Sequence, residues 1–100
     1  MRETTIDQLE PALREGAALV DVRAPAEYAE GHIPGAVNVP MGQLSARLGE
    51  LDRGRPVLVV CASGNRSGAM TDVLTAAGYD AANVVGGTRA WVESGRPVER

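Results

Sequence analysis

Two uninterrupted apolar runs are the most strand-like segments of the chain. Residues 57–60 are Val-Leu-Val-Val, between a proline and a polar loop, and residues 17–22 are apolar except for Asp21. Continuous apolar runs of this length are typical of strands buried on both faces of a parallel sheet. We therefore expect both segments to be strands, with residues 57–60 at the centre of the sheet.

Three shorter segments complete the predicted sheet. Residues 4–6 indicate a short edge strand, residues 32–40 contain a turn and a short strand, and residues 82–85 indicate a last strand. The strand within residues 32–40 ends at Pro40, because proline cannot donate to the hydrogen-bond ladder of a central strand.

Helical patterns alternate with these strands. Apolar spacings, capping residues and glycine stops predict helices over residues 7–15, 25–30, 41–50, 67–77 and 88–92. Three of these helices begin at residue types that commonly cap helix N-termini, namely Asp7, Ser67 and Thr88. Pro25 can open the second helix at its first position.

This alternation predicts the fold class. Strands separated by short helices pair in parallel through right-handed crossovers, which gives an α/β fold with a central, mostly parallel open sheet and helices on both faces. One hundred residues is about the modal size of a domain, so we expect a single domain over residues 1–100. Ligands of such sheets bind beyond the carboxyl ends of the strands, where residues 21–23, 61–66 and 86–87 should meet.

The composition limits the function classes. Hydrophobic residues make up 44% and charged residues 23%, which argues against a disordered or fibrous chain. The net charge is −3, so we expect no nucleic-acid partner and no membrane binding, and no apolar run approaches the ~20 residues of a bilayer span. A single cysteine cannot form an internal disulfide, so the expected location is the cytoplasm.

The segment after the central strand carries the candidate chemistry. Cys61 follows the strand directly, and Gly64 and Asn65 tolerate backbone conformations that turn consecutive N–H groups toward one point. A helix beginning at Ser67 adds free N–H groups, and Arg66 adds a positive charge. We expect Cys61 to lie at the rim of this anion-binding cup, with a thiol pKa below the free value of about 8.5. The alternative is that Cys61 is a small buried hydrophobic residue.

The loop Cys61-Ala62-Ser63-Gly64-Asn65-Arg66-Ser67-Gly68 resembles the active-site loop of rhodanese-type sulfurtransferases. The upstream segment is similar to that family's first signature at Leu19-Val20-Asp21-Val22-Arg23, Glu27-Tyr28, Gly31-His32-Ile33, Gly35-Ala36 and Asn38-Val39-Pro40. The tail resembles its closing segment at Gly86-Gly87, Trp91, Gly95 and Pro97-Val98. The resemblance therefore covers a rhodanese-like core of about residues 4–98.

The resemblance implies a sulfurtransferase that works by double displacement. Cys61 would take a sulfur atom from thiosulfate or a persulfide donor and pass it, through a Cys61 persulfide, to a thiol, to cyanide or to an acceptor protein. The implied substrate and persulfide loop consists of Ala62, Ser63, Gly64, Asn65, Arg66 and Ser67. Arg23 and Arg66 are candidate contacts for the substrate anion, and neither a cofactor nor a metal is implied.

The loop length distinguishes between two chemistries. Cys61 and Arg66 are separated by four residues, whereas the related cysteine phosphatases have one residue more and a wider cup. A tight ring of amides suits a sulfur atom carried on the cysteine, and a tetrahedral phosphate would be crowded there. Sulfur transfer is therefore favoured over phosphate hydrolysis.

Several roles have alternatives. The domain could be a non-enzymatic or complex-dependent sulfur carrier, or a partner-binding module of the same fold. Arg66 could support the loop without touching substrate, and Arg23 could be a surface residue paired with Glu27. Asp21 and His32 are expected to be structural, because a carboxylate would raise the cysteine pKa and a thiolate held by amides needs no base. Trp91 and Tyr28 are expected to pack with their polar tips hydrogen-bonded.

Overall fold

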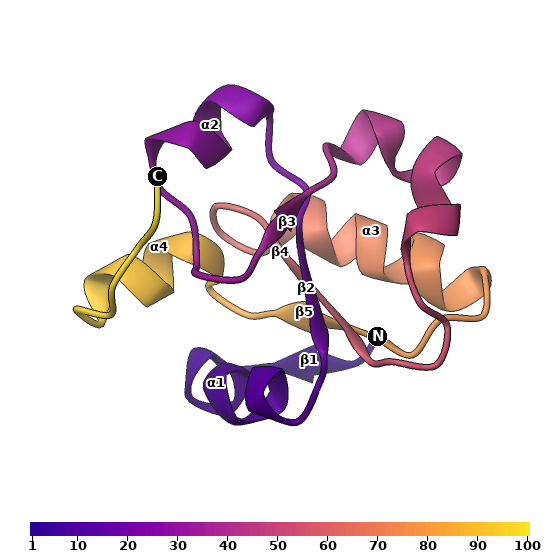
Figure 1. Ribbon diagram of the computed structural model, residues 1–100, viewed down its shortest axis with the longest axis horizontal. Helices are drawn as coiled ribbons and strands as arrows, with labels where there is room; N and C mark the ends of the chain where they lie inside the picture. Colours follow the sequence, from indigo (N-terminus) through magenta and orange to yellow (C-terminus); the bar gives the residue numbers. More distant parts are fainter.

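Five parallel strands form the sheet of this protein. The computed structural model describes residues 1–100, and its strand order is β1-β5-β4-β2-β3 (Figure 1). The strands are β1 (Glu3–Thr4), β2 (Ala18–Asp21), β3 (Val37–Asn38), β4 (Val57–Val60) and β5 (Ala81–Val84). Every neighbouring pair is parallel, and β4 lies at the centre. The predicted fold class and the central place of residues 57–60 are confirmed.

The helices cover both faces of the sheet. They are α1 (Ile6–Arg14), α2 (Pro25–Glu30), the 3-10 helix η1 (Met41–Glu50), α3 (Asn65–Ala76) and α4 (Gly87–Glu93). Figure 1 shows α1 and α4 on one face, with α3 and η1 on the other. None of the helices is long and apolar enough to cross a membrane.

Each face of the sheet has its own apolar core, because successive side chains of a strand point to opposite faces. Leu58 and Val60 of β4 pack with residues of α1 and α4, among them Leu9 and Trp91. Val57 and Val59 pack against the other face, beneath α3 and η1. A continuous apolar run such as β4 is therefore buried on both sides, as its sequence predicts.

Several element boundaries differ from the sequence prediction. The edge strand and the last strand each begin one residue earlier than predicted. The first helix is capped by Thr5 and not by Asp7, and the side chain of Gln8 accepts a hydrogen bond from the Thr5 N–H at 3.1 Å. Thr5 has the extended backbone of a cap, so the helix begins before Asp7.

Both helices next to the candidate site also begin earlier than predicted, each after a glycine. Gly64 has φ 106° and precedes α3, which makes Ser67 the third helical residue and not the cap. Gly86 has φ 81° and precedes α4, so Thr88 is likewise inside its helix. Glycine adopts this left-handed conformation without steric cost, which lets the chain turn sharply from strand into helix.

The first turn of α4 docks on the backbone that follows β4. The N–H of Thr88 donates to the Cys61 carbonyl at 2.9 Å, and the N–H of Arg89 donates to the Ala62 carbonyl at 3.0 Å. Gly87 has φ 60°, and a Cβ there would lie 2.4 Å from the Cys61 carbonyl oxygen. Only glycine permits this approach, so Gly87 fixes α4 against the cysteine loop.

We expect Gly87→Ala to destabilise the protein more than a glycine substitution that introduces no clash. Gly95 is the matched control, because it has φ 82° and a Cβ added there would meet no atom within 4 Å. Gly95→Ala should lose about 1–2 kcal/mol for the left-handed backbone alone. Gly87→Ala should lose about 1–3 kcal/mol more, since the neighbouring backbone must move. Urea unfolding measures both, and equal losses would show that the close approach carries no cost.

Candidate active site

The sulfur of Cys61 receives hydrogen bonds from the first turn that follows it. The Gly64 N–H donates to Sγ at 3.1 Å, and the Ser67 hydroxyl lies 3.3 Å from Sγ. Burial raises the pKa of the Cys61 thiol, but the Ser67 side chain and the backbone N–H groups of Ser67, Gly64 and Ser63 can donate to the charged sulfur, and together they hold the pKa below its usual value. The environment thus favours the thiolate, which is the nucleophilic form.

Cys61 is buried, and the expectation that it lies at the rim of the cup is wrong. Its exposed fraction is 1%, and it belongs to the apolar core that contains Val59 and Leu74. The physical reason is the alternation of β4, since residues 57, 59 and 61 point to one face, where α3 covers them. Apolar side chains and hydrogen-bond donors therefore surround the same sulfur atom.

Asn83 is a functional-site residue that the sequence analysis missed. This buried side chain of β5 accepts a hydrogen bond from the Ser67 hydroxyl at 2.6 Å and donates from Nδ2 to the Gly64 carbonyl at 3.2 Å. The signal was present in the sequence, because an asparagine within an apolar strand needs buried partners. Asn83 connects β5 to both residues that contact the Cys61 sulfur.

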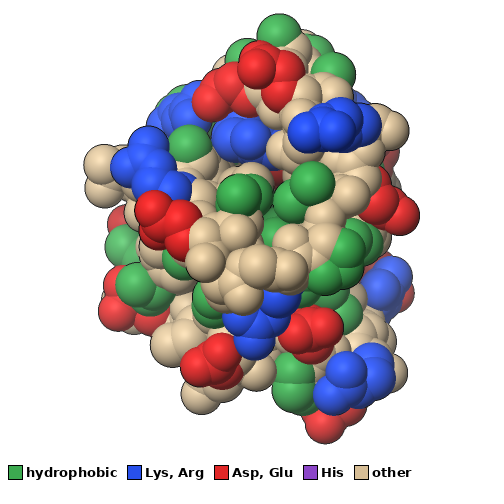
Figure 2. All heavy atoms as spheres, turned by 90° about the vertical axis from the view of Figure 1, so that its left-hand side faces the viewer, with side chains coloured by type: hydrophobic (Ala, Val, Ile, Leu, Met, Phe, Trp, Pro, Cys, Tyr) green, Lys and Arg blue, Asp and Glu red, His purple; other side chains and the backbone are tan.

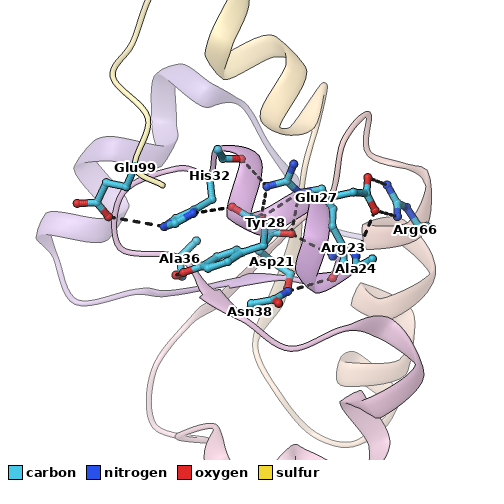
Figure 3. Close-up of polar contacts among 11 residues, drawn as sticks. Asp21, Arg23, Ala24, Glu27, Tyr28, His32, Ala36, Asn38, Arg66 and Glu99 are labelled. Carbon is cyan, nitrogen blue, oxygen red and sulfur yellow. Dashed lines mark hydrogen bonds and ion pairs between the residues drawn. The ribbon is translucent and has the colours of Figure 1, made fainter.

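Arg66 forms a two-pronged ion pair with Glu27 (Figure 3). Its two terminal nitrogens lie 2.7 and 2.9 Å from the Glu27 carboxylate oxygens. These hydrogen bonds lower the pKa of Glu27 to about 2 and raise that of Arg66. The pair ties α2 to the start of α3, so Arg66 supports the loop from outside the sulfur's hydrogen-bond shell.

Arg23 is buried and not a surface residue, so its expected alternative pairing with Glu27 is wrong. Its guanidinium pairs with the Asp21 carboxylate, with Nη2 at 2.8 Å from Oδ2, and donates to the Gly31 carbonyl at 2.8 Å (Figure 3). Asp21 also accepts from the Arg23 backbone N–H at 3.0 Å. The structural role expected for Asp21 is confirmed.

The aromatic residues and the histidine have the expected structural contacts. The Tyr28 hydroxyl donates to the Ala36 carbonyl at 2.6 Å, and the Trp91 indole N–H donates to the Pro97 carbonyl at 2.7 Å. The His32 ring stacks on Tyr28 with centroids 3.7 Å apart. His32 thus belongs to the turn between α2 and β3, and no titratable base contacts the sulfur.

A pocket of about 580 Å³ lies beside the loop, between α2, α4 and the C-terminal segment. Its walls include Ala62, Arg23 and Arg89, but not Cys61. Figure 2 looks onto this side of the molecule, where acidic and basic side chains surround a hollowed surface. Thr88 also lines the pocket, and its hydroxyl is buried without a hydrogen-bond partner.

The structure brings some of the predicted loop residues together and separates others. Gly64 and Ser67 contact the sulfur, and Ala62 forms part of the pocket wall. Ser63 and Asn65 have exposed side chains, so any contribution to the sulfur site comes from their backbone. No group of three or more histidine, cysteine or carboxylate side chains is arranged to hold a metal ion.

The chain is similar to known proteins of one family. Residues 5–94 match the family model described as the rhodanese-like domain. A sulfurtransferase of Allochromatium vinosum is 40% identical over 85 residues, which span 84% of this chain and 79% of the relative.

Two solved structures are also similar. A rhodanese-related protein of Thermoplasma volcanium superposes with a TM-score of 0.92 at 32% identity, covering 99% of this chain and 98% of that one. A rhodanese-like domain protein of Staphylococcus aureus gives a TM-score of 0.84 at 39% identity, covering 91% of both chains.

Removing the charge of Glu27 should destabilise the protein in a pH-dependent way. Because its folded-state pKa of about 2 lies below the unfolded value of 4.5, the contribution is complete above pH 4.5 and decreases as the pH falls toward 2. We expect Glu27→Gln to lose less than about 1 kcal/mol at pH 7, since the pair is partly exposed. Urea unfolding at pH 7 and pH 3 should show the loss shrinking.

Glu30→Gln is the matched control, because Glu30 lies on the same helix and forms no ion pair. Its effect should be smaller than that of Glu27→Gln at pH 7. A Glu27→Gln loss that is equal at both pH values would contradict a charge-dependent role for the Glu27–Arg66 pair.

Proposed function

The chain belongs to the rhodanese-like domain family, and on that premise we propose that it transfers a sulfur atom through a persulfide on Cys61. The relative named a sulfurtransferase supports a sulfurtransferase activity. The observation that carries the proposal is that the Gly64 N–H donates to the only thiol of the chain and that the Ser67 hydroxyl lies beside the same sulfur at 3.3 Å. A sulfur atom with such donors is a better nucleophile at neutral pH and a better leaving group.

The proposed reaction has two displacements. In the first, the Cys61 thiolate attacks the outer sulfur of thiosulfate, a new S–S bond forms, and the old S–S bond breaks with its electron pair leaving on sulfite. In the second, a thiolate or cyanide attacks the outer sulfur of the persulfide and Cys61 leaves as a thiolate. A low-molecular-weight persulfide donor would react in the same way, with its own thiolate as the leaving group.

The loop amides would hold the charge of the persulfide. The terminal sulfur of a persulfide carries negative charge, and the backbone N–H groups of residues 62–67 are the donors closest along the chain. The chain has no second cysteine that could resolve the persulfide as a disulfide. The carried sulfur must therefore go to another molecule, which makes a small thiol or a protein acceptor part of the proposal.

The pocket beside the loop is the proposed site for the donor. Ala62 in its wall is bonded directly to Cys61, and Arg23 and Arg89 supply positive charge for an anion such as thiosulfate. Arg66 is the other candidate anion contact, and it would have to leave Glu27 to act as one. Because only 1% of Cys61 is exposed, the donor reaches Sγ after the side chain or the loop has moved.

The burial of Cys61 favours a second candidate function. A sulfur carrier that works only within a complex would keep its cysteine covered until a partner opens the loop, and the exposed fraction of 1% fits that behaviour. The two candidates use the same persulfide and differ in whether a small donor is sufficient. A location in the cytoplasm, where thiols stay reduced, is part of both proposals.

Loading with thiosulfate tests the proposed function. After incubation and removal of small molecules, we expect the intact mass of the protein to rise by one sulfur atom, and cyanide should remove that increment. Cys61→Ser should show no increment. An unchanged mass with thiosulfate and with a persulfide donor alike would contradict the enzyme. Loading that occurs only when a partner protein is added would support the complex-dependent carrier.

Thr88 is expected to bind the donor after the same movement that uncovers Cys61, because its buried hydroxyl has no partner within the protein. A buried hydroxyl without a hydrogen bond costs about 1–3 kcal/mol. Thr88→Val keeps the side-chain shape, so it should raise the free energy of unfolding while raising the KM for thiosulfate several-fold. Thermal unfolding and steady-state kinetics measure the two effects. Thr88→Ser, which retains a hydroxyl, is the control, and an unchanged KM in Thr88→Val would contradict donor binding.

A further inference from the structure

Four hydrogen bonds around Cys61 form a closed ring. The Gly64 N–H donates to the Cys61 sulfur, and Asn83 Nδ2 donates to the Gly64 carbonyl. The Ser67 hydroxyl lies 2.6 Å from Asn83 Oδ1 and 3.3 Å from the Cys61 sulfur. The ring thus joins the Cys61 sulfur to the Gly64 backbone and to the side chains of Asn83 and Ser67.

The chemistry of the partners fixes the direction of each bond. A backbone carbonyl only accepts hydrogen bonds, so the Asn83 nitrogen faces Gly64 and the Asn83 oxygen faces Ser67. That oxygen also only accepts, and the Ser67 hydroxyl has a single proton. At 2.6 Å, this proton lies on the Asn83 side of Ser67. The Ser67 oxygen then faces Cys61 as an acceptor for the S–H of the thiol.

We propose that Asn83 is a positioning residue that draws the single proton of Ser67 away from the sulfur of Cys61, and so limits how readily the resting thiol ionises. In the resting protein the thiol donates to Ser67, and Ser67 donates to Asn83. When Cys61 loses its proton to solvent, Ser67 can donate to the thiolate only by giving up Asn83. The backbone N–H donors stabilise the thiolate and lower the thiol pKa. The ring of hydrogen bonds stabilises the protonated thiol and so opposes that lowering.

This competition would protect a thiol that has no internal resolving partner. A freely ionised cysteine is open to oxidation and to adventitious electrophiles. A thiol held in the ring is less open to both, and it gains the Ser67 donor only when the hydroxyl turns from Asn83 to the sulfur. Only this protective role rests on the proposed function. The hydrogen-bond ring and the position of its protons belong to the resting protein, whatever reaction it performs.

The charged groups on the neighbouring elements do not depend on Asn83. Arg66 on α3 is paired with Glu27 on α2, and Arg23 is paired with Asp21 at the end of β2. Arg89 is the charged residue of the first turn of α4, and β5 carries none. A substitution at Asn83 therefore changes the hydrogen bonds to Ser67 and Gly64 and leaves the charges around the loop in place.

The pH dependence of Cys61 alkylation tests the proposal without any sulfur donor. The midpoint of the alkylation rate against pH measures ionisation, and the plateau rate measures access to the buried sulfur. Asn83→Ala frees the Ser67 proton for the thiolate, so the midpoint should fall by about one pH unit, the worth of one hydrogen bond to a charged group. A midpoint that stays or rises would overturn the proposal.

Two further variants separate this role from loop support. Asn83→Ala also removes the hydrogen bond to Gly64. We therefore compare Ser67→Ala with the double variant Ser67→Ala/Asn83→Ala, and expect the same alkylation midpoint in both because no Ser67 proton remains to be released. An equal shift in both backgrounds would mean that Asn83 acts through Gly64 alone, and the proposal would fail. Asn83→Asp keeps the acceptor for Ser67 and should raise the midpoint.

Ser67→Ala alone gives a test that needs no change at Asn83. If Asn83 holds the proton, Ser67 contributes little net stabilisation to the thiolate, and the midpoint should move by less than about half a unit. An upward shift of a full unit would show that Ser67 donates to the sulfur unopposed. The two hypotheses can fail separately. If the midpoints are as predicted but the protein takes up no sulfur, the proposed proton arrangement stands and the proposed function is contradicted.

Discussion

The alternation of side chains along β4 determines the surroundings of the Cys61 sulfur. Val57, Val59 and Cys61 point to the same face, so the apolar packing that holds the central strand continues up to the thiol. Burial of this kind raises a thiol pKa and so opposes formation of the thiolate. The loop after β4 and the first turn of α3 place hydrogen-bond donors beside a sulfur that otherwise lies in a hydrophobic core.

The docking of α4 orients the two peptide groups that directly follow Cys61. In a planar trans peptide the C=O and N–H groups point in opposite directions. The carbonyls of Cys61 and Ala62 accept from the first turn of α4, so the N–H groups of Ala62 and Ser63 are turned away from that helix. Gly87 permits the close approach, the Gly64 N–H donates to Sγ, and the positive φ of Gly64 then turns the chain into α3. Gly64 before α3 and Gly87 at the start of α4 thus both shape the backbone around the Cys61 sulfur.

The sequence predicts local features well and long-range pairings poorly. The apolar runs predicted the central strand, and the loop motif indicated the candidate nucleophile, Cys61, whose sulfur accepts a hydrogen bond from Gly64. The start of α3 was placed too late because Gly64 and Asn65 are also typical turn residues. The pairing of Arg66 with Glu27 joins residues far apart in the chain, which no local pattern reveals. The burial of Cys61 could have been predicted, since the two-residue period of β4 extends to position 61.

The burial of Cys61 has opposite effects on loading and on storage if the cysteine carries sulfur as proposed. A covered thiol reacts slowly with a donor in solution, but a persulfide beneath the same cover is also shielded from bulk thiols that would remove its outer sulfur. The chain has no second thiol that could remove the carried sulfur from within, so the lifetime of the persulfide depends on how well this cover excludes thiols from solution. The molecule that opens the loop therefore decides where the sulfur goes, so acceptor specificity depends on the contacts of Ala62 and the pocket wall more than on the reactivity of Sγ.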